Sequence, residues 1–230
     1  MIADAERGPF QRTGDGIYRC TRLEQFKWLD HGFSTRRSVA LPQSIATLRQ
    51  IHSNLVRNAR GLADRSMEGD SLISNEPGKV IGVRTADCVP ILLVDAQTRS
   101  VAAIHAGWRG TAANIVVRTV EHMANAFQTN PLHIFAAIGP AIGGCCYEVG
   151  LDVAAQFKGT FPELATDGHK RVMLDLPEAN RRLLLSAGVP RTQVYPSELC
   201  TFCNSDDFFS YRREQANPGR MISFISIRID

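Results

Sequence analysis

The chain has 230 residues, of which 44% are hydrophobic and 21% are charged, an ordinary balance for a globular protein with a sizeable core. A formal net charge of +3 excludes a nucleic-acid binder that depends on a strong overall field. No window approaches the ~18 apolar residues of a membrane helix, and the N-terminus lacks the pattern of a signal peptide, so we expect a cytoplasmic protein with neither a membrane nor a nucleic-acid partner.

Strands and helices alternate along the chain. The polar stretch 57–70 predicts a loop or a short element, and Pro90 interrupts the first apolar stretch because it cannot donate to a strand ladder. One apolar stripe at spacings of 4, 3 and 4 indicates an amphipathic helix after Thr111, its predicted N-cap. The expected strands are 79–95 (in two parts), 100–107, 132–140, 171–176, 191–197 and 221–229, and the expected helices are 111–128 and 177–188.

This alternation predicts a mixed α/β (α+β) fold. We expect one domain over residues 1–230, built as a layered sandwich of mixed sheets flanked by helices. The order of the strands does not follow from the pattern.

Three residues stand at the ends of apolar or alternating segments, next to turn or polar residues. They are His52 in RQIHSN, Cys88 in TADCVP and His105 in VAAIHAGWRGT. Strand ends that face loops are common places for functional sites. Two imidazoles and a thiolate form a three-ligand set suited to zinc, with a fourth position open for water. Such an ion would keep Cys88 as a thiolate and lower the pKa of bound water toward ~7. Taken singly, each residue also fits a satisfied place in the core.

A second interpretation needs no metal. Cys88 is then a nucleophile and His105 is its general base.

Asp87 is a candidate catalytic carboxylate that orients a histidine, although a turn aspartate fits the pattern equally well. Asp70 in EGDSL is a similar carboxylate with a smaller claim.

Three arginines are candidates for binding an anionic substrate. Arg36, Arg84 and Arg109 lie close to these segments, and their planar guanidinium groups suit oxyanions. For each one alone, a structural salt bridge is the simpler interpretation. Trp108 fits a core anchor better than a stacking platform.

Four further cysteines lie outside this group. They are Cys145, Cys146, Cys200 and Cys203. A closed four-thiolate zinc site is one interpretation, but the vicinal pair lacks the usual C-x₂₋₄-C spacing. The pattern therefore favours buried free thiols.

Taken together, the segments resemble the YfiH family of laccase-domain proteins, also called polyphenol oxidase family proteins and peptidoglycan editing factors. The combination of ADC-x-P and HAGWRGT is highly specific. The matching segments run in order over most of the chain: QIHSN (50–54), GDSLIS (69–74), TADCVPILLVD (85–95), AAIHAGWRGT (102–111), AAIGPAIGGCCYEVG (136–150), LCTFC (199–203), FFSYRRE (208–214) and GRMISFI (219–225).

The resemblance implies a metal site at His52, Cys88 and His105 and a zinc cofactor. It implies small-molecule substrates: phosphate with purine nucleosides, including methylthioadenosine, for phosphorolysis, and adenosine for deamination. The family is also similar in fold to deamidases with a Cys-His pair, which keeps the nucleophile interpretation open. The segment GFSTRRSVALPQSIATLRQIHSN is shorter than in the family and lacks its Gly-Gly-x-Ser and Leu-Asn-Leu pieces, so Arg36 carries over least directly.

The number and spacing of the histidines test whether this chain can be a multicopper laccase. The chain has six and no His-x-His, too few for the copper centres of a multicopper oxidase. A lone His₂Cys centre can still take Cu²⁺ in vitro because Cu²⁺ binds such ligands more tightly than Zn²⁺. The sequence thus favours a zinc-dependent purine nucleoside phosphorylase and adenosine deaminase. The alternatives are a Cys-His amidase that edits peptidoglycan precursors, a copper-loaded polyphenol oxidase, and a metal-buffering or partner-binding protein.

Overall fold

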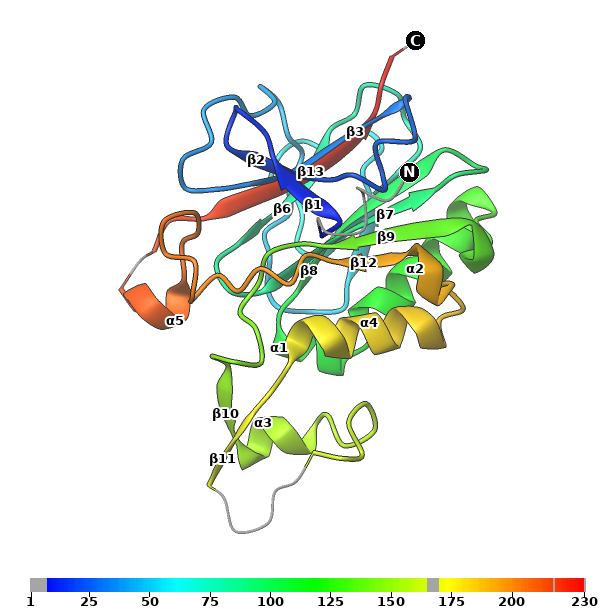
Figure 1. The fold of residues 1–230 in the computed structure, drawn as a ribbon. Coiled ribbons are helices and arrows are strands. Elements are labelled where there is room, and N and C mark those ends of the chain that lie inside the picture. Colours follow the sequence, from blue (N-terminus) through cyan, green and yellow to red (C-terminus); the bar gives the residue numbers. More distant parts are fainter. Residues whose placement is uncertain (1–7, 165–169, 217, 230) are drawn as a thin grey trace, which may run out of the picture.

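Two large β-sheets form the body of the protein (Figure 1). The computed structural model describes residues 8–164, 170–216 and 218–229. The first sheet has the order β12-β9-β7-β8-β5-β4 and the second the order β1-β2-β3-β13-β6. The first is built from β12 (Val194–Pro196), β9 (Ile134–Ile138), β7 (Val89–Asp95), β8 (Ser100–Ala106), β5 (Ser71–Ser74) and β4 (Val56–Asn58), and the second from β1 (Phe10–Arg12), β2 (Ile17–Cys20), β3 (Leu29–Ser34), β13 (Met221–Ile227) and β6 (Ile81–Thr85).

The six-stranded sheet is covered on both faces. Every residue of β7 and β8 is buried, which explains their nearly continuous apolar sequences. Alternate side chains point to opposite faces. Leu92 and Val94 of β7 belong to a core shared with the five-stranded sheet, whereas Ile91 and Leu93 belong to a second core under the helices. The molecule is therefore layered as sheet, sheet and helices, and the mixed α/β prediction is confirmed.

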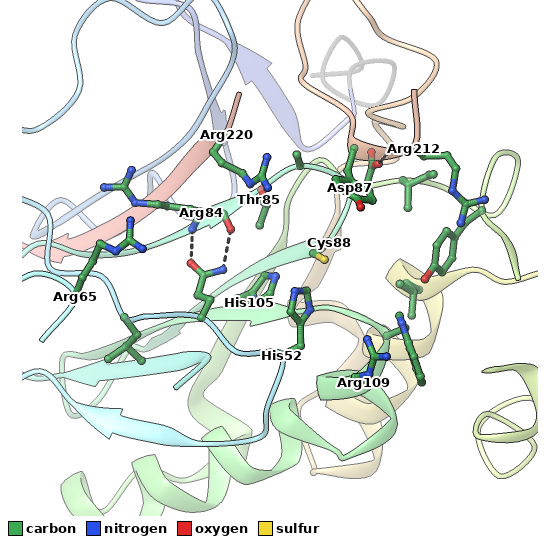
Figure 2. Close-up of a pocket in the computed structure, with 18 residues that line it drawn as sticks. His52, Arg65, Arg84, Thr85, Asp87, Cys88, His105, Arg109, Arg212 and Arg220 are labelled. Atoms are coloured by element: carbon green, nitrogen blue, oxygen red, sulfur yellow. Dashed lines mark hydrogen bonds between the residues drawn. The ribbon is translucent and has the colours of Figure 1, made fainter. Parts of the chain in front are cut away.

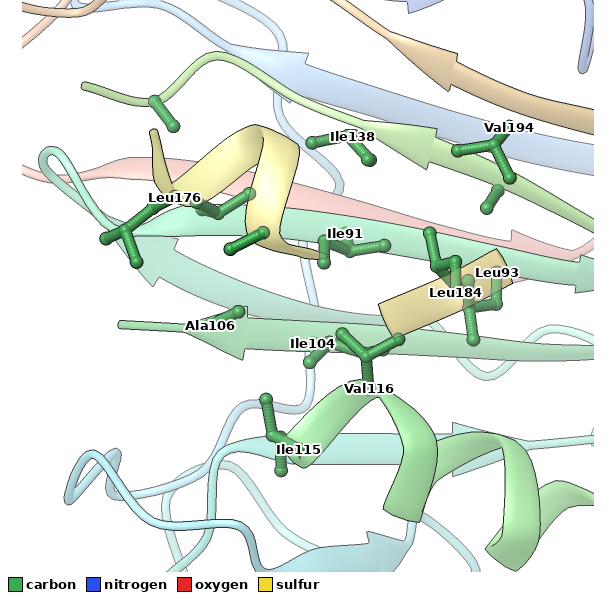
Figure 3. Packing of buried hydrophobic residues seen from close by; sticks show 14 of the residues in the cluster. Ile91, Leu93, Ile104, Ala106, Ile115, Val116, Ile138, Leu176, Leu184 and Val194 are labelled. Atoms are coloured by element: carbon green, nitrogen blue, oxygen red, sulfur yellow. The ribbon is translucent and has the colours of Figure 1, made fainter. Parts of the chain in front are cut away.

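Two helices provide most of the outer layer. Val116 of α2 and Leu184 of α4 meet Ile91, Leu93 and Ile104 of the sheet (Figure 3). The helices are α1 (Trp108–Ala112), α2 (Ile115–Phe127), α3 (Leu151–Ala155), α4 (Leu176–Ser186) and α5 (Tyr211–Glu214), with 3-10 turns at Pro131–His133 and Arg191–Gln193.

The helix expected over 111–128 begins later in the structure, at Ile115. The chain forms the short α1 first and breaks at Asn114, whose φ of 60° lies in the left-handed region. Thr111 therefore lies inside α1, and the prediction that it caps the long helix was wrong. Its buried position is explained by Asn180, whose side-chain amide donates to the Thr111 hydroxyl at 3.1 Å.

A small two-stranded sheet stands apart from the two large sheets. Strands β10 (Glu148–Gly150) and β11 (Arg171–Met173) pair antiparallel and lie next to α3 (Figure 1). The strands expected at 79–95, 100–107, 132–140, 171–176, 191–197 and 221–229 are all present, some of them shorter. None of the helices in the described part of the chain has the length and apolarity needed to span a bilayer.

The strand register brings distant segments to one end of the six-stranded sheet. β7 begins there and β8 ends there, with Pro90 opposite His105. β5 begins at the same end and runs antiparallel to β8, with Ser71 opposite Ile104. The residues just before β7 and β5 and the last residues of β8 are consequently neighbours.

Candidate active site

The three predicted metal ligands meet at this end of the sheet. Cys88 directly precedes β7, His105 lies near the end of β8, and His52 lies in the loop before β4. Their donor atoms all lie within 4.8 Å of one another, and the two imidazole rings meet edge to face with centroids 4.9 Å apart. Figure 2 shows the three side chains pointing toward one another. His105 is buried, Cys88 is half-buried and His52 is exposed, so the group forms the floor of an open site.

Asp70 holds the two histidine segments together. Its fully buried carboxylate accepts a hydrogen bond from His105 Nδ1 at 2.7 Å. Because a carboxylate only accepts, Nδ1 carries a proton and Nε2 faces the other ligands. The same carboxylate accepts the backbone N–H groups of Ile51, His52 and Ser53 and the Ser53 hydroxyl. This network holds His52 at a φ of 58°.

Asp87 has other partners. Its carboxylate accepts hydrogen bonds from the hydroxyls of Thr201 and Ser210 and from the backbone N–H of Arg212. The carboxylate that orients a histidine is therefore Asp70, and the assignment of that role to Asp87 was wrong. Asp87 does line the cavity described below, with a φ of 84° that turns the chain into Cys88.

Cys88 and His105 favour each other's charged forms, the thiolate and the imidazolium. Burial by itself raises the pKa of the Cys88 thiol, but the His105 charge and hydrogen bonds from both histidines outweigh it and lower the pKa. Burial by itself lowers the pKa of His105, but the Cys88 thiolate and Asp70 outweigh it and raise the pKa. The thiolate is the form that both binds metals and attacks carbon.

A cavity of about 720 Å³ opens above these residues. Five arginines line it, with Arg65, Arg84 and Arg220 on one side of the metal-ligand group and Arg109 and Arg212 on the other (Figure 2). None of the five forms an ion pair with a carboxylate in the described parts of the chain. Such a basic cavity suits an anionic ligand.

Two of the three predicted substrate arginines, Arg84 and Arg109, line this cavity. Arg36 does not. Its guanidinium donates to the Ser205 carbonyl, lies 3.7 Å from the Glu214 carboxylate and stacks on Phe209, so the structure gives it a packing role away from the cavity.

Several cavity residues escaped the sequence analysis. Arg65 carries no motif signal, because only folding brings its loop to the site, whereas Arg220 could have been found from its place in the family segment GRMISFI. Arg212 could have been found from its place in the family segment FFSYRRE. Tyr147 and Tyr211 also line the cavity and join Trp108 as aromatic side chains there.

The donor set fits a metal ion. Two imidazoles and one thiolate at mutual distances below 4.8 Å match a three-ligand zinc site with one open position. Gly107 supports this arrangement. A Cβ atom there would lie 2.7 Å from His52 Nδ1 and 3.1 Å from Cys88 Sγ, so only glycine leaves the space between these ligands free. In the described residues, two clusters could hold a metal ion, this one and a group of four cysteines.

The comparisons with known proteins identify the family of the chain. Residues 33–228 match the family model described as multi-copper polyphenol oxidoreductase laccase. The chain is 43% identical over 183 residues to a purine nucleoside phosphorylase of Deinococcus radiodurans, a match that covers 79% of this chain and 70% of that protein. It is 42% identical over 168 residues to adenosine deaminase RL5 of an unknown prokaryotic organism, covering 70% of this chain and 64% of that protein.

A solved structure shows the same fold. YlmD of Geobacillus stearothermophilus superposes with a TM-score of 0.86 at 30% identity, over 97% of this chain and 100% of that one. The match thus covers both sheets, the helical layer and the site at the end of the six-stranded sheet. The chain belongs to the multi-copper polyphenol oxidoreductase laccase family, which includes the YfiH- and YlmD-type proteins.

Proposed function

We propose that this protein is a zinc-dependent purine nucleoside phosphorylase that also cleaves methylthioadenosine and deaminates adenosine, and that it works in the cytoplasm. The observation that carries the proposal is the convergence of His52, Cys88 and His105 at the floor of a large cavity lined by five arginines that form no ion pair within the described residues. The names of the relatives point to the same two activities.

The cavity has room and charge for a nucleoside and a phosphate together. Its volume of about 720 Å³ lies within the range of small-molecule sites. Arg65, Arg84 and Arg220 share one wall, and we assign the phosphate to it. Arg84 Nε and Thr85 Oγ1 in this wall are buried and have no hydrogen-bond partner among the described residues. Buried donors without partners are costly, and a small shift of these two cavity-lining side chains toward a bound oxyanion would give them one.

The opposite wall fits the nucleoside. Arg109 lies 4.3 Å from the ring centre of Trp108, and Arg212 lies 5.1 Å from that of Tyr147. These stacked pairs present flat apolar faces next to hydrogen-bond donors. A purine base needs both, since its rings stack and its nitrogens accept hydrogen bonds.

The two reactions then differ in the attacking group. In phosphorolysis the C1′–N9 bond breaks, a phosphate oxygen bonds to C1′, and the departing purine takes up a proton. In deamination water adds at C6 of adenosine, and ammonia leaves. A zinc ion held by His52, Cys88 and His105 would supply a Lewis acid at the floor of the cavity. Asp70 fixes the ring of His105, and the arginines of the first wall would bind the phosphate next to the nucleoside.

The experiment compares the two reactions in the same variants, purified without added copper. Arg84→Ala should lower kcat/KM for inosine phosphorolysis roughly 10- to 150-fold, because one charged hydrogen bond contributes about 1.5–3 kcal/mol. Adenosine deamination should change little because it uses no phosphate. Arg36→Ala is the matched control, since this arginine lies outside the cavity. Equal losses of both activities in Arg84→Ala would contradict the phosphate assignment.

The metal assignment has its own test. Cys88→Ala should lose the zinc ion of this site together with both activities. Wild-type protein that carries zinc but turns over neither inosine with phosphate nor adenosine would overturn the proposed function.

A second candidate rests on the alignment of Cys88, His105 and Asp70. These residues stand in the order nucleophile, base and orienting carboxylate, as in Cys-His hydrolases. An amidase of this type would retain or gain activity on amide substrates after chelation, whereas the phosphorylase would lose activity. Chelation therefore separates the two functions.

A further inference from the structure

Four cysteines converge at a second place, outside the cavity. Cys145 and Cys146 lie between β9 and β10, and Cys200 and Cys203 follow β12. The Cys203 sulfur lies 3.4 Å from that of Cys146 and 3.8 Å from that of Cys145. All four sulfur atoms lie within 4.8 Å of one another, and all four are free thiols. The expectation of buried thiols holds for Cys200 alone, because Cys145 and Cys203 are exposed and Cys146 is half-buried.

We propose that these four cysteines bind one Zn²⁺ ion in a closed tetrahedral site that is structural and separate from the candidate active site. A Zn–S bond of about 2.3 Å places the sulfurs of a tetrahedron about 3.8 Å apart. The Cys145–Cys203 sulfur distance of 3.8 Å matches this spacing, and the Cys146–Cys203 distance of 3.4 Å is somewhat shorter. A disulfide would need one pair at about 2.05 Å and would not gather all four sulfurs. A zinc ion also offsets the mutual repulsion of four thiolates.

Each pair of cysteines sits on a hydrogen-bonded turn. The Cys146 backbone N–H donates to the Gly143 carbonyl at 3.0 Å, and the Asn204 backbone N–H donates to the Cys200 carbonyl at the same distance. Cys200-x-x-Cys203 has the spacing of a zinc half-site, and the vicinal pair supplies the other half from a second turn. The sequence argued against this site because the vicinal pair lacks the usual C-x₂₋₄-C spacing. Only the structure shows that the two turns meet.

Contacts around the sulfurs suit bound thiolates. The backbone N–H of Gly143 donates to the Cys200 sulfur at 3.3 Å. Hydrogen bonds of this kind favour the charged form of the thiol and orient metal ligands. Arg213 fixes the second turn by donating to the carbonyls of Thr201 and Phe202 at 2.8 Å each.

The four-cysteine site is coupled to the wall of the cavity. Thr201, directly after Cys200, donates to the Asp87 carboxylate at 2.6 Å. Tyr147, directly after Cys146, lines the cavity. Metal at the four cysteines would thus hold this wall in place without touching the substrate. Its loss should raise KM more than it lowers kcat.

The test counts metal ions per full-length chain by native mass spectrometry after purification with Zn²⁺. Wild type should carry two zinc ions, and Cys203→Ser and Cys145→Ser should each carry one and melt at a lower temperature. Cys88→Ser should also carry one, and the Cys88→Ser, Cys203→Ser double variant should carry none. Cys20→Ala is the control, because Cys20 is a buried thiol outside both clusters and its loss should leave two ions.

Cobalt identifies the ligands. Co²⁺ bound to Cys88→Ser should give the intense sulfur-to-metal absorption of a four-thiolate site, and Cys203→Ser should lose most of it. The proposal is overturned if wild type carries a single ion that persists in both Cys203→Ser and Cys145→Ser. It is also overturned if the mass of the purified chain is lower by two hydrogen atoms because Cys146 and Cys203 form a disulfide. If an ion were lost in Cys145→Ser and Cys203→Ser but not in Cys88→Ser, the result would support the four-cysteine site and refute the zinc at Cys88.

Discussion

Asp70→Asn tests whether one buried carboxylate organises the whole metal-ligand group. One carboxylate oxygen of Asp70 accepts from His105 Nδ1 and the His52 backbone N–H. The other accepts from the Ile51 and Ser53 backbone N–H groups and the Ser53 hydroxyl. An asparagine amide must replace one of these oxygens with an NH₂ group. Whichever way it turns, at least two donors lose their acceptor.

The magnitude follows from this count. A buried donor without a partner costs about 1–3 kcal/mol, so the free energy of unfolding should fall by roughly 2–6 kcal/mol. Zinc affinity should fall about 10- to 100-fold, as is typical when the hydrogen-bond partner of a ligand histidine is removed. Urea unfolding at pH 7 measures the first quantity, and competition with a zinc chelator measures the second.

Asp95→Asn is the matched control. Asp95 is also fully buried, but it lies at the other end of β7, where one oxygen accepts the backbone N–H groups of Gln97 and Thr98. Its other oxygen has no partner in the described residues, so the amide can turn its NH₂ group there. This variant should keep wild-type zinc affinity. If Asp70→Asn also kept wild-type stability and affinity, the argument that Asp70 organises the site would be refuted.

Three further outcomes are expected. Gly107→Ala should abolish metal binding at the site, because the new Cβ would lie 2.7 Å from His52 Nδ1. The circular dichroism spectrum of the variant should stay native, because the φ of −73° suits alanine. If the variant still bound the metal, the crowding argument would be contradicted. Burial lowers the pKa of His31 to about 4 from 6.5, so wild type should lose about 3 kcal/mol of stability as pH falls between these values. His31→Gln, which can still accept from the Cys20 backbone N–H, should flatten that pH dependence in denaturant titrations, and an unchanged slope would exclude His31 as its source. Leu184→Ala should reduce the free energy of unfolding by about 2–5 kcal/mol without changing kcat, and a loss below 1 kcal/mol would mean that the helical layer repacks.

The local elements of this fold could be predicted from the sequence because their signals are local. Apolar runs such as 89–95 and 100–106 are buried on both faces, and the stripe through Val116, Val120 and Met123 faces the core. The break at Asn114 was missed because no glycine or proline marks it. Tertiary packing offsets the energetic cost of the left-handed backbone at Asn114, and a local sequence pattern carries no information about that packing.

The candidate site could be predicted only in part. His52, Cys88 and His105 stand out because each interrupts a pattern at the end of a segment, and strand ends meet at sheet edges. Choosing between Asp70 and Asp87 required the pairing of β5 with β8, which places Asp70 beside His105. That pairing depends on contacts between residues far apart in the chain.

Sequence alone determined the chemical types of the metal-ligand group: two imidazoles and a thiol. The tertiary structure decided which carboxylate orients His105, and it gathered arginines from separate loops into one basic cavity. It also brought two distant cysteine pairs within ligand distance of one another. The physical reason is that hydrophobic periodicity reports which face of an element is buried, whereas a site depends on which elements become neighbours when those faces pack.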